Sequence, residues 1–234
     1  MPIVESLDLP EGPSVRRPRH AADRAGRGTR LRRLASSAAM QPIFLVVGGP
    51  GVGKSTTSRA LAATFPRSIH VPVDDLRHMV VAGLALPGQH WPAELVRQIA
   101  LAREAAVRMA LDYAEAGFAV VLDDFYDPNG LAEYRELLAR PEAQGIVLFP
   151  NQAEARRRNA ARSPGEAGAY IDEAIPTAYS FLEPALERLA GDGWLVLDTS
   201  DLDVGGAVAA ILDHARLRSS RLEAAPGSTP TRAP

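Results

Sequence analysis

The sequence contains no cysteine. This absence excludes a disulfide framework, a zinc site built from thiolates and a cysteine nucleophile. The five histidines are scattered along the chain and do not have the spacing of metal ligands. Any chemistry must therefore depend on other side chains.

Long apolar runs and a strong net charge are also missing. No run approaches the roughly 20 apolar residues that span a bilayer, and the amino terminus lacks the apolar core of a secretory signal. The formal net charge is −2 at pH 7 and the sequence pI is near 6.2. The chain as a whole therefore has no electrostatic preference for nucleic acid or for an anionic membrane. We expect a cytoplasmic protein with no membrane partner.

Lysine is almost absent, because Lys54 is the only one among 26 basic Lys and Arg residues. The arginine-rich composition itself is typical of drift in base composition. Arginine can replace lysine where geometry is loose, but a planar guanidinium cannot replace a compact ammonium inside a tight ring of backbone amides. The single lysine therefore marks a position with a specific chemical requirement.

The 234 residues suit one folded domain with tails. Residues 1–40 are rich in Pro, Gly, Ser and Arg without apolar periodicity, which predicts a disordered basic arm. The alternative is that the native protein starts at Met40. Residues 220–234 have a similar composition and predict a second disordered tail, which leaves 41–219 as the domain.

Within this domain, apolar β-branched runs alternate with helical patterns. That alternation predicts an α/β fold, a three-layer α/β/α sandwich with a five-stranded parallel sheet. The predicted strands are 43–47, 69–73, 118–122, 146–149 and 194–197. The predicted helices are 56–65, 76–81, 92–116, 131–138, 153–162, 171–190 and 204–216.

A glycine-rich loop follows the first predicted strand. Residues 48–55 match the pattern Gly-x₄-Gly-Lys-Ser/Thr of a phosphate-binding loop. Glycines let successive N–H groups point at a polyphosphate where a Cβ would obstruct them, and the next helix adds its N-terminal dipole. The motif predicts ATP and Mg²⁺ as cofactors, with Lys54 on the β- and γ-phosphates and the Ser55 hydroxyl on the metal. The predicted nucleotide-binding residues are Gly48, Gly49, Pro50, Gly51, Val52, Gly53, Lys54, Ser55 and Thr56.

Three other interpretations of this loop fail. A dinucleotide fingerprint, Gly-x-Gly-x-x-Gly, would need glycine where Lys54 or Thr56 stands. A standard GTPase needs a second lysine for its Asn-Lys-x-Asp motif. A large remodelling ATPase needs a further helical domain, and too few residues follow Leu197. The length suits a small kinase.

Two acidic pairs close predicted strands. Asp74 and Asp75 follow the second strand, and we expect Asp74 to lie beside the first strand and its loop, at the carboxyl edge of the sheet. Asp123 and Asp124 follow the third strand, where a carboxylate can hold Mg²⁺; we favour Asp123, and Asp124 remains an alternative. Each site also has a structural alternative, in which the acid caps the next turn or helix.

Together these blocks, with Val-Asp-Asp-Leu-Arg at 73–77, Val-Val-Leu-Asp-Asp at 120–124 and Arg-Asn-Ala-Ala-Arg at 158–162, resemble a group of AAA-type small P-loop kinases. The group includes polynucleotide 5′-kinase, chloramphenicol phosphotransferase and zeta-toxin-like kinases. The resemblance covers about residues 41–215.

The resemblance implies roles for individual residues. Asp74 would be the general base, and Arg77 a substrate-side arginine. Arg158 and Arg162 would close over the nucleotide from a short lid. The alternative for these arginines is a solvated helix face. The sequence departs from the group after Asp123, where it has Asp-Phe-Tyr-Asp in place of Thr or Asn-Thr, so contacts of those polar side chains are not expected here.

We therefore expect an ATP-dependent kinase that phosphorylates a hydroxyl of a small molecule. The segment 78–94 is apolar and aromatic rather than basic, which favours a small, partly apolar acceptor over a nucleic-acid end. Two alternatives stay open. One is a polynucleotide or tRNA-end kinase anchored by the basic arm, and the other is a switch module that needs only nucleotide occupancy.

Overall fold

Five short apolar segments form one parallel sheet. We describe the protein from a computed structural model, which defines residues 41–86, 91–127, 131–162 and 166–224; the predicted arm lies outside these ranges. The sheet has the order β2-β3-β1-β4-β5, and all neighbouring strands are parallel. This confirms the predicted fold class. The strands are β1 (Ile43–Gly48), β2 (Ser68–Pro72), β3 (Ala119–Phe125), β4 (Ala143–Leu148) and β5 (Leu195–Leu197).

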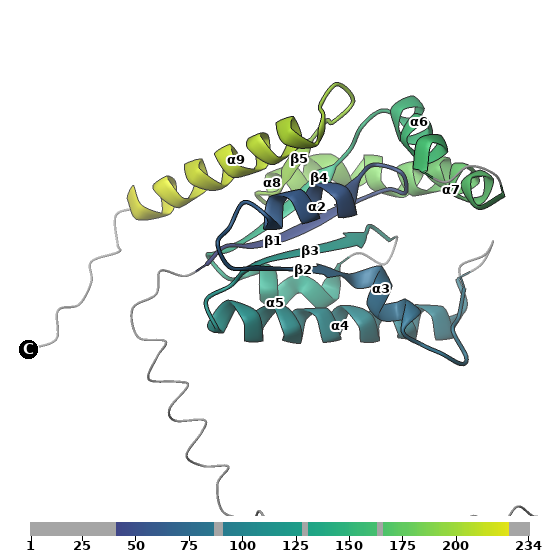
Figure 1. The fold of residues 1–234 in the computed structure, drawn as a ribbon, viewed down its shortest axis with the longest axis horizontal. Helices are drawn as coiled ribbons and strands as arrows, with labels where there is room; N and C mark the ends of the chain where they lie inside the picture. Colours follow the sequence, from purple (N-terminus) through teal and green to yellow (C-terminus); the bar gives the residue numbers. More distant parts are fainter. Residues whose placement is uncertain (1–40, 87–90, 128–130, 163–165, 225–234) are drawn as a thin grey trace, which may run out of the picture. The chain divides into compact units, whose positions relative to one another are not determined.

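Helices cover both faces of the sheet (Figure 1). Helices α2 (Lys54–Ala62) and α9 (Val204–Ala224) lie on one face, and α4 (Ala93–Glu115) and α5 (Arg135–Leu138) lie on the other. The remaining helical segments are α3 (Val73–His78), η1 (Ala132–Tyr134), α6 (Gln152–Arg162), α7 (Glu166–Leu182), η2 (Glu183–Ala185) and α8 (Leu186–Gly191). None of the helices in the described ranges is long and apolar enough to cross a membrane.

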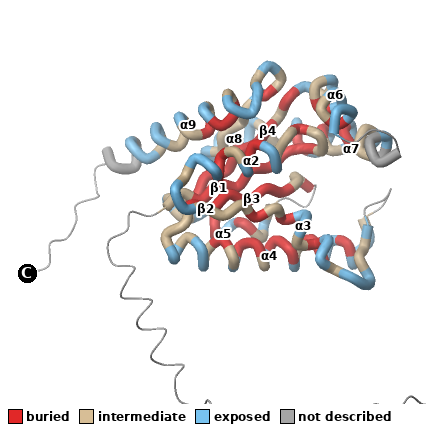
Figure 2. Tube along the Cα trace, viewed as in Figure 1, coloured by how far each residue is buried: buried red, intermediate tan, exposed pale blue. Residues whose placement is uncertain are grey.

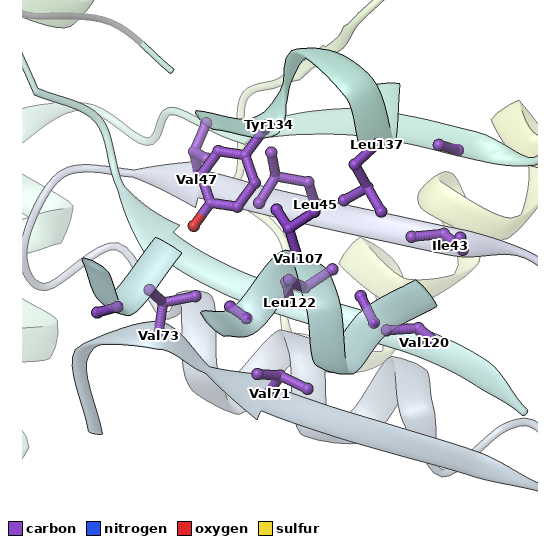
Figure 3. Close-up of a cluster of buried hydrophobic side chains, with 14 of the residues drawn as sticks. Ile43, Leu45, Val47, Val71, Val73, Val107, Val120, Leu122, Tyr134 and Leu137 are labelled. Atoms are coloured by element: carbon purple, nitrogen blue, oxygen red, sulfur yellow. The ribbon is translucent and has the colours of Figure 1, made fainter. Parts of the chain in front are cut away.

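Two apolar cores form because successive side chains of a strand point to opposite faces. In β1, Ile43, Leu45 and Val47 belong to the core under α4 and α5, and Phe44 and Val46 belong to the core under α2 and α9. Buried residues run through the whole of β1 and β4 and through β3 as far as Asp124 (Figure 2). Figure 3 shows the first core, where side chains of the strands meet those of α4, η1 and α5. This packing anchors the carboxyl edge of the sheet.

The position of β2 differs from our expectation. We predicted that Asp74 lies beside the first strand, but β3 separates β2 from β1. The burial of the strands explains this order. All residues of β3 up to Asp124 are buried, whereas β2 is half-exposed and ends at Pro72, and proline lacks the N–H that an interior strand must donate.

Several element boundaries also differ. Strand β3 continues through Asp123 and Asp124 to Phe125, so these acids lie within the strand. Helix α3 begins at Val73, so Asp74 lies in its first turn and does not cap it. The helix predicted over 171–190 is divided into α7, η2 and α8, because Pro184 disfavours helical geometry at the residue before it. Helix α9 continues to Ala224, five residues beyond the predicted domain end.

Candidate functional site

The glycine loop joins β1 to α2 in a conformation that other residues avoid. Gly51 has a φ of 75° and Gly53 a φ of 94°, both in the left-handed region. A Cβ on Gly51 would lie 2.6 Å from the carbonyl oxygen of Ala155 in α6. Beyond the loop, the first N–H groups of α2 have no acceptor within the helix. The loop therefore has the free donors and close approach that a polyphosphate requires.

Lys54 is the first residue of α2, and its Nζ donates a hydrogen bond to the Gly49 carbonyl oxygen at 2.8 Å. Burial lowers the pKa of Lys54, and the carboxylates of Asp123, Asp124 and Asp74 act against that shift. A bound polyphosphate would also stabilise the charged form of Lys54, as these carboxylates do. Lys54, the residue predicted to bind phosphate, therefore lies in the electrostatic field of Asp123, the predicted metal ligand, and of Asp74, the predicted base.

Ser55 and Asp123 meet across the end of the sheet. The Ser55 Oγ donates a hydrogen bond to Asp123 Oδ1 at 3.0 Å. Asp123 is buried, and its Oδ2 lies 2.5 Å from His70 Nε2 on β2. Our sequence analysis missed His70; its only signal was a polar residue within the second strand.

The oxygens of Ser55 and Asp123 suit Mg²⁺, which uses one or two protein oxygens together with phosphate oxygens and water. In the part of the chain that the structure describes, no group of three or more His, Cys, Asp or Glu residues is arranged to hold a metal ion. Ser55 and Asp123 therefore offer the one or two protein oxygens that Mg²⁺ uses when it is bound together with phosphates.

Asp124 belongs to a buried ion network. Its Oδ2 accepts hydrogen bonds from Arg103 Nε at 2.6 Å and from the Tyr134 hydroxyl at 2.9 Å. Arg103 also pairs with Asp127 at 2.6 Å. Burial alone would lower the pKa of Arg103, but the carboxylates of Asp124 and Asp127 outweigh it and raise that pKa. Because Asp124 is committed to Arg103, Asp123 is the carboxylate of the pair that faces Ser55.

The sequence analysis did not find Arg103. The available signal is a charged side chain on the buried face of α4, which also carries Ile99, Ala102 and Ala106. Such a residue almost always has a buried partner.

Asp74 is half-exposed and paired to the next turn of α3. Its Oδ1 accepts hydrogen bonds from Arg77 Nη2 at 3.1 Å and Arg77 Nε at 3.3 Å, and its Oδ2 lies 3.9 Å from His78 Nδ1. Arg77 is buried and also donates to the Ala85 carbonyl oxygen at 3.2 Å. Burial excludes the solvated-face interpretation of Arg77. Its charge is paired with Asp74 in the structure, and its substrate-side role stays a prediction.

The two predicted lid arginines differ. All five N–H groups of Arg158 have protein acceptors: Nε donates to Glu154 at 2.7 Å, Nη1 to Val52 O and Thr199 Oγ1, and Nη2 to the carbonyl oxygens of Thr199 and Leu202. These contacts hold Arg158 between the loop and the β5–α9 connection, and its catalytic role stays a prediction. Arg162, one turn further along α6, is exposed and acts electrostatically on Lys54.

A cavity of about 600 Å³ lies on the flank of the loop away from Asp74. Its size is in the usual range for a small-molecule site. It is lined by the loop, the start of α2, α6 and the β5–α9 connection (Gly51, Val52, Gly53, Thr56, Thr57, Glu154, Arg157, Arg158, Arg162, 199–204 and Ala207). Arg158 connects two of its walls, because it bonds to both the loop and the β5–α9 connection.

Comparison with known proteins gives one family and several structures with a similar fold. Residues 43–196 match the family described as AAA domain. No curated protein matches the chain. A shikimate kinase from Acinetobacter baumannii, solved in complex with shikimate, has a TM-score of 0.53 and 17% identity, covering 82% of this chain and 99% of that one.

Two further structures are less similar. A gluconokinase from Sinorhizobium meliloti 1021 has a TM-score of 0.47 and 16% identity, covering 79% of this chain and 95% of that one. The tunicamycin resistance protein of Deinococcus radiodurans has a TM-score of 0.45 and 15% identity, covering 78% and 95%. At such identities the likeness concerns the fold alone.

Proposed function

The chain belongs to the AAA domain family, and from this premise we propose that it is an ATP-dependent kinase that transfers the γ-phosphate to a hydroxyl of a small molecule. The observation that carries the proposal is the meeting of Ser55 with Asp123 at 3.0 Å beside Lys54, with Asp74 close enough to act on the Lys54 charge. Within the small kinases, we assign it to the group that includes polynucleotide kinases, chloramphenicol phosphotransferases and zeta-toxin-like kinases.

In this proposal ATP, the phosphate donor, occupies one flank of β1. The cavity between α6 and the β5–α9 connection receives the base and ribose of ATP, and the glycine loop with Lys54 binds the phosphates. Ser55 and Asp123 would hold Mg²⁺, which would supply positive charge to stabilise the phosphates during transfer. Arg158 positions the walls of this site, and Arg162 supplies a guanidinium for the transferring phosphoryl group.

The acceptor occupies the other flank, beside α3. Its hydroxyl oxygen attacks the γ-phosphorus, the bond from the γ-phosphorus to the bridging oxygen of ADP breaks, and the hydroxyl proton passes to Asp74 Oδ2. The hydrogen bonds from Arg77 to Oδ1 hold the carboxylate so that Oδ2 faces outward. Positioning and charge neutralisation supply most of the acceleration in this chemistry.

Asp74→Asn tests the proposal, and Asp75→Asn is the matched control because Asp75 is its exposed neighbour in α3. With γ-labelled ATP and a broad panel of hydroxyl compounds, Asp74→Asn should lower transfer by roughly 10²–10⁴-fold while ATP affinity stays unchanged. Asp75→Asn should transfer like the wild type. Equal transfer by the Asp74 variant and the wild type would contradict the assignment. ATP binding by the wild type without transfer to any compound would favour a nucleotide-occupancy switch.

A further inference from the structure

The basic side chains around the acceptor flank are few, and each is engaged. Residues 73–107, which run from α3 into α4, contain three arginines and no lysine. Arg77 is bound to Asp74 and Ala85. Arg97 is bound through two donors to Glu94, at 2.9 and 3.0 Å. Each of these two guanidinium groups is therefore already paired with a carboxylate of the protein.

Arg103 is also unavailable to an acceptor. Its side chain is 1% exposed, and its charge is balanced by Asp124 and Asp127 at 2.6 Å each, with Glu133 at 3.4 Å. A guanidinium buried among three carboxylates cannot reach a ligand at the surface. Arg103 therefore adds structural support and no anion-binding capacity.

The other elements near this flank do not supply a cation. Residues 119–130 and residues 166–182 contain no lysine or arginine. Arg188 in α8 is bound to Asp192 and to the Tyr126 hydroxyl. In contrast, Asp75 is exposed, and Asp74, although paired with Arg77, is half-exposed. An anionic acceptor would lie beside the exposed Asp75 carboxylate. Apart from Lys54 and Arg162, which serve the phosphates of the donor in the proposed function, the described residues of this flank would offer it no unpaired guanidinium or ammonium.

Apolar side chains occupy the same flank. Met79 is 69% exposed, Val81 100% and Leu86 65%, all in the segment that follows α3. Gln98 in α4 fixes this segment: its Oε1 accepts a hydrogen bond from the Ala85 N–H at 2.9 Å, and its Nε2 donates to the Gly83 carbonyl oxygen at 2.8 Å. Large apolar groups held in water next to a proposed catalytic base are typical of a ligand-binding surface.

Two aromatic rings also lie in this region, and one of them lines a hollow together with the base. The rings of Trp91 and Phe125 lie 6.2 Å apart, and Phe125 directly follows the acidic pair of β3. Phe125 also lines a small hollow with Asp74, Val73 and Ile99, and this hollow is too small for a water molecule. An acceptor would therefore rest against the rim formed by these rings and by the segment 79–86.

From the paired cations, the exposed carboxylates and the apolar rim, we infer that the acceptor is an uncharged or cationic alcohol with an apolar body. The inference rests on the proposed kinase function and goes beyond it, because it excludes sugar acids, sugar phosphates, nucleotides and nucleic-acid ends. Binding depends on apolar contact with the segment 79–86 and Trp91, and the hydroxyl points toward Asp74.

The test uses alcohols in matched sets, in which one phenyl-substituted skeleton carries a carboxylate, a carboxamide or an amine, together with an oligonucleotide that ends in a 5′-hydroxyl. The full chain is assayed with γ-labelled ATP for labelled product. Slow ATP hydrolysis, in which water is the acceptor, is measured in parallel, and inhibition by each compound reports binding even without a correctly placed hydroxyl.

We expect the carboxamide and amine to bind at least ten times more tightly than the matching carboxylate, and the oligonucleotide neither to inhibit nor to be labelled. Val81→Ser should weaken the binding of the carboxamide several-fold. The control Leu217→Ser, at an apolar residue of α9 that is 62% exposed, should not change it.

Preferred binding or labelling of the carboxylate or the oligonucleotide would overturn the inference while the kinase function stands. Equal binding of all three charge forms, or equal effects of the two serine variants, would also overturn it. If ATP hydrolysis responds to no compound and is unchanged in Asp74→Asn, the proposed function fails, and the inference fails with it.

Discussion

Gly51→Ala should damage the loop far more than the same substitution at Gly83. Both glycines have left-handed backbones, with φ of 75° at Gly51 and 79° at Gly83. They differ in surroundings, because an added Cβ at Gly51 lies 2.6 Å from the Ala155 carbonyl oxygen, whereas no atom lies within 4 Å of a Cβ at Gly83. Gly83→Ala therefore reports the backbone strain alone, and the difference between the two variants reports the steric collision at Gly51.

The magnitudes follow from these two contributions. A left-handed alanine costs about 1–2 kcal/mol, which applies at both positions. Collision with a backbone atom that cannot rotate away adds an overpacking cost of about 1–3 kcal/mol at Gly51. The free energy of unfolding should therefore fall by about 2–5 kcal/mol for Gly51→Ala and by about 1–2 kcal/mol for Gly83→Ala.

Urea unfolding without nucleotide measures both losses, and calorimetric titration with ATP measures the effect on the loop. Gly51→Ala should bind ATP at least tenfold more weakly, because relief of the collision must move the loop or α6, while Gly83→Ala should retain wild-type affinity. Equal losses of stability in the two variants would refute the argument, since they would show that contact with α6 does not constrain the loop.

Three further predictions concern the sheet and its edge. Asp124→Asn should lower the free energy of unfolding by about 3 kcal/mol, because Arg103 loses a buried partner, while Asp123→Asn should keep the fold in urea unfolding and lose Mg²⁺-dependent ATP binding. Gly145→Ala should cost about 1–3 kcal/mol in the same assay, because its Cβ would lie 2.2 Å from the Trp194 ring, and adding Trp194→Leu should recover part of that loss. Burial lowers the pKa of Lys54 below its usual 10.5, so the folded, nucleotide-free chain holds that proton more weakly than the unfolded chain. The free energy of unfolding should then rise as the pH increases toward the usual pKa of lysine, near 10.5, and an unchanged rise in Lys54→Met would contradict this origin.

Local patterns were sufficient to predict the elements and the phosphate loop. Strands of consecutive apolar residues and the glycine-lysine-serine motif depend on neighbours in the chain, so the predicted strands appear in the structure with shifts of one to three residues at most ends. Helix α4 was also predictable from local signals, because Pro92 precedes it and Gly117, with a φ of 81°, follows it.

The site residues were harder to predict because their partners are distant in sequence. The motif for Arg158 suggested a lid arginine, but Val52 and Thr199, which are 106 and 41 residues away, occupy its donors. His70 and Arg103 have only weak local signals, a polar residue within a strand and a charged residue on an apolar helix face, and neither signal identifies a partner. Their contacts with the acidic pair of β3 exist only because β2 and α4 pack beside that strand.

The sequence alone determined the fold class, the nucleotide loop and the need for a lysine at position 54, because these depend on short-range geometry and on side-chain chemistry. Only the tertiary structure decided which acid of the β3 pair contacts Ser55, which carboxylates pair with Arg77 and Arg103, and which side chains line the cavity beside the loop. The order of strands in a sheet and the pairing of buried charges minimise the free energy of the whole domain, and no single segment specifies them.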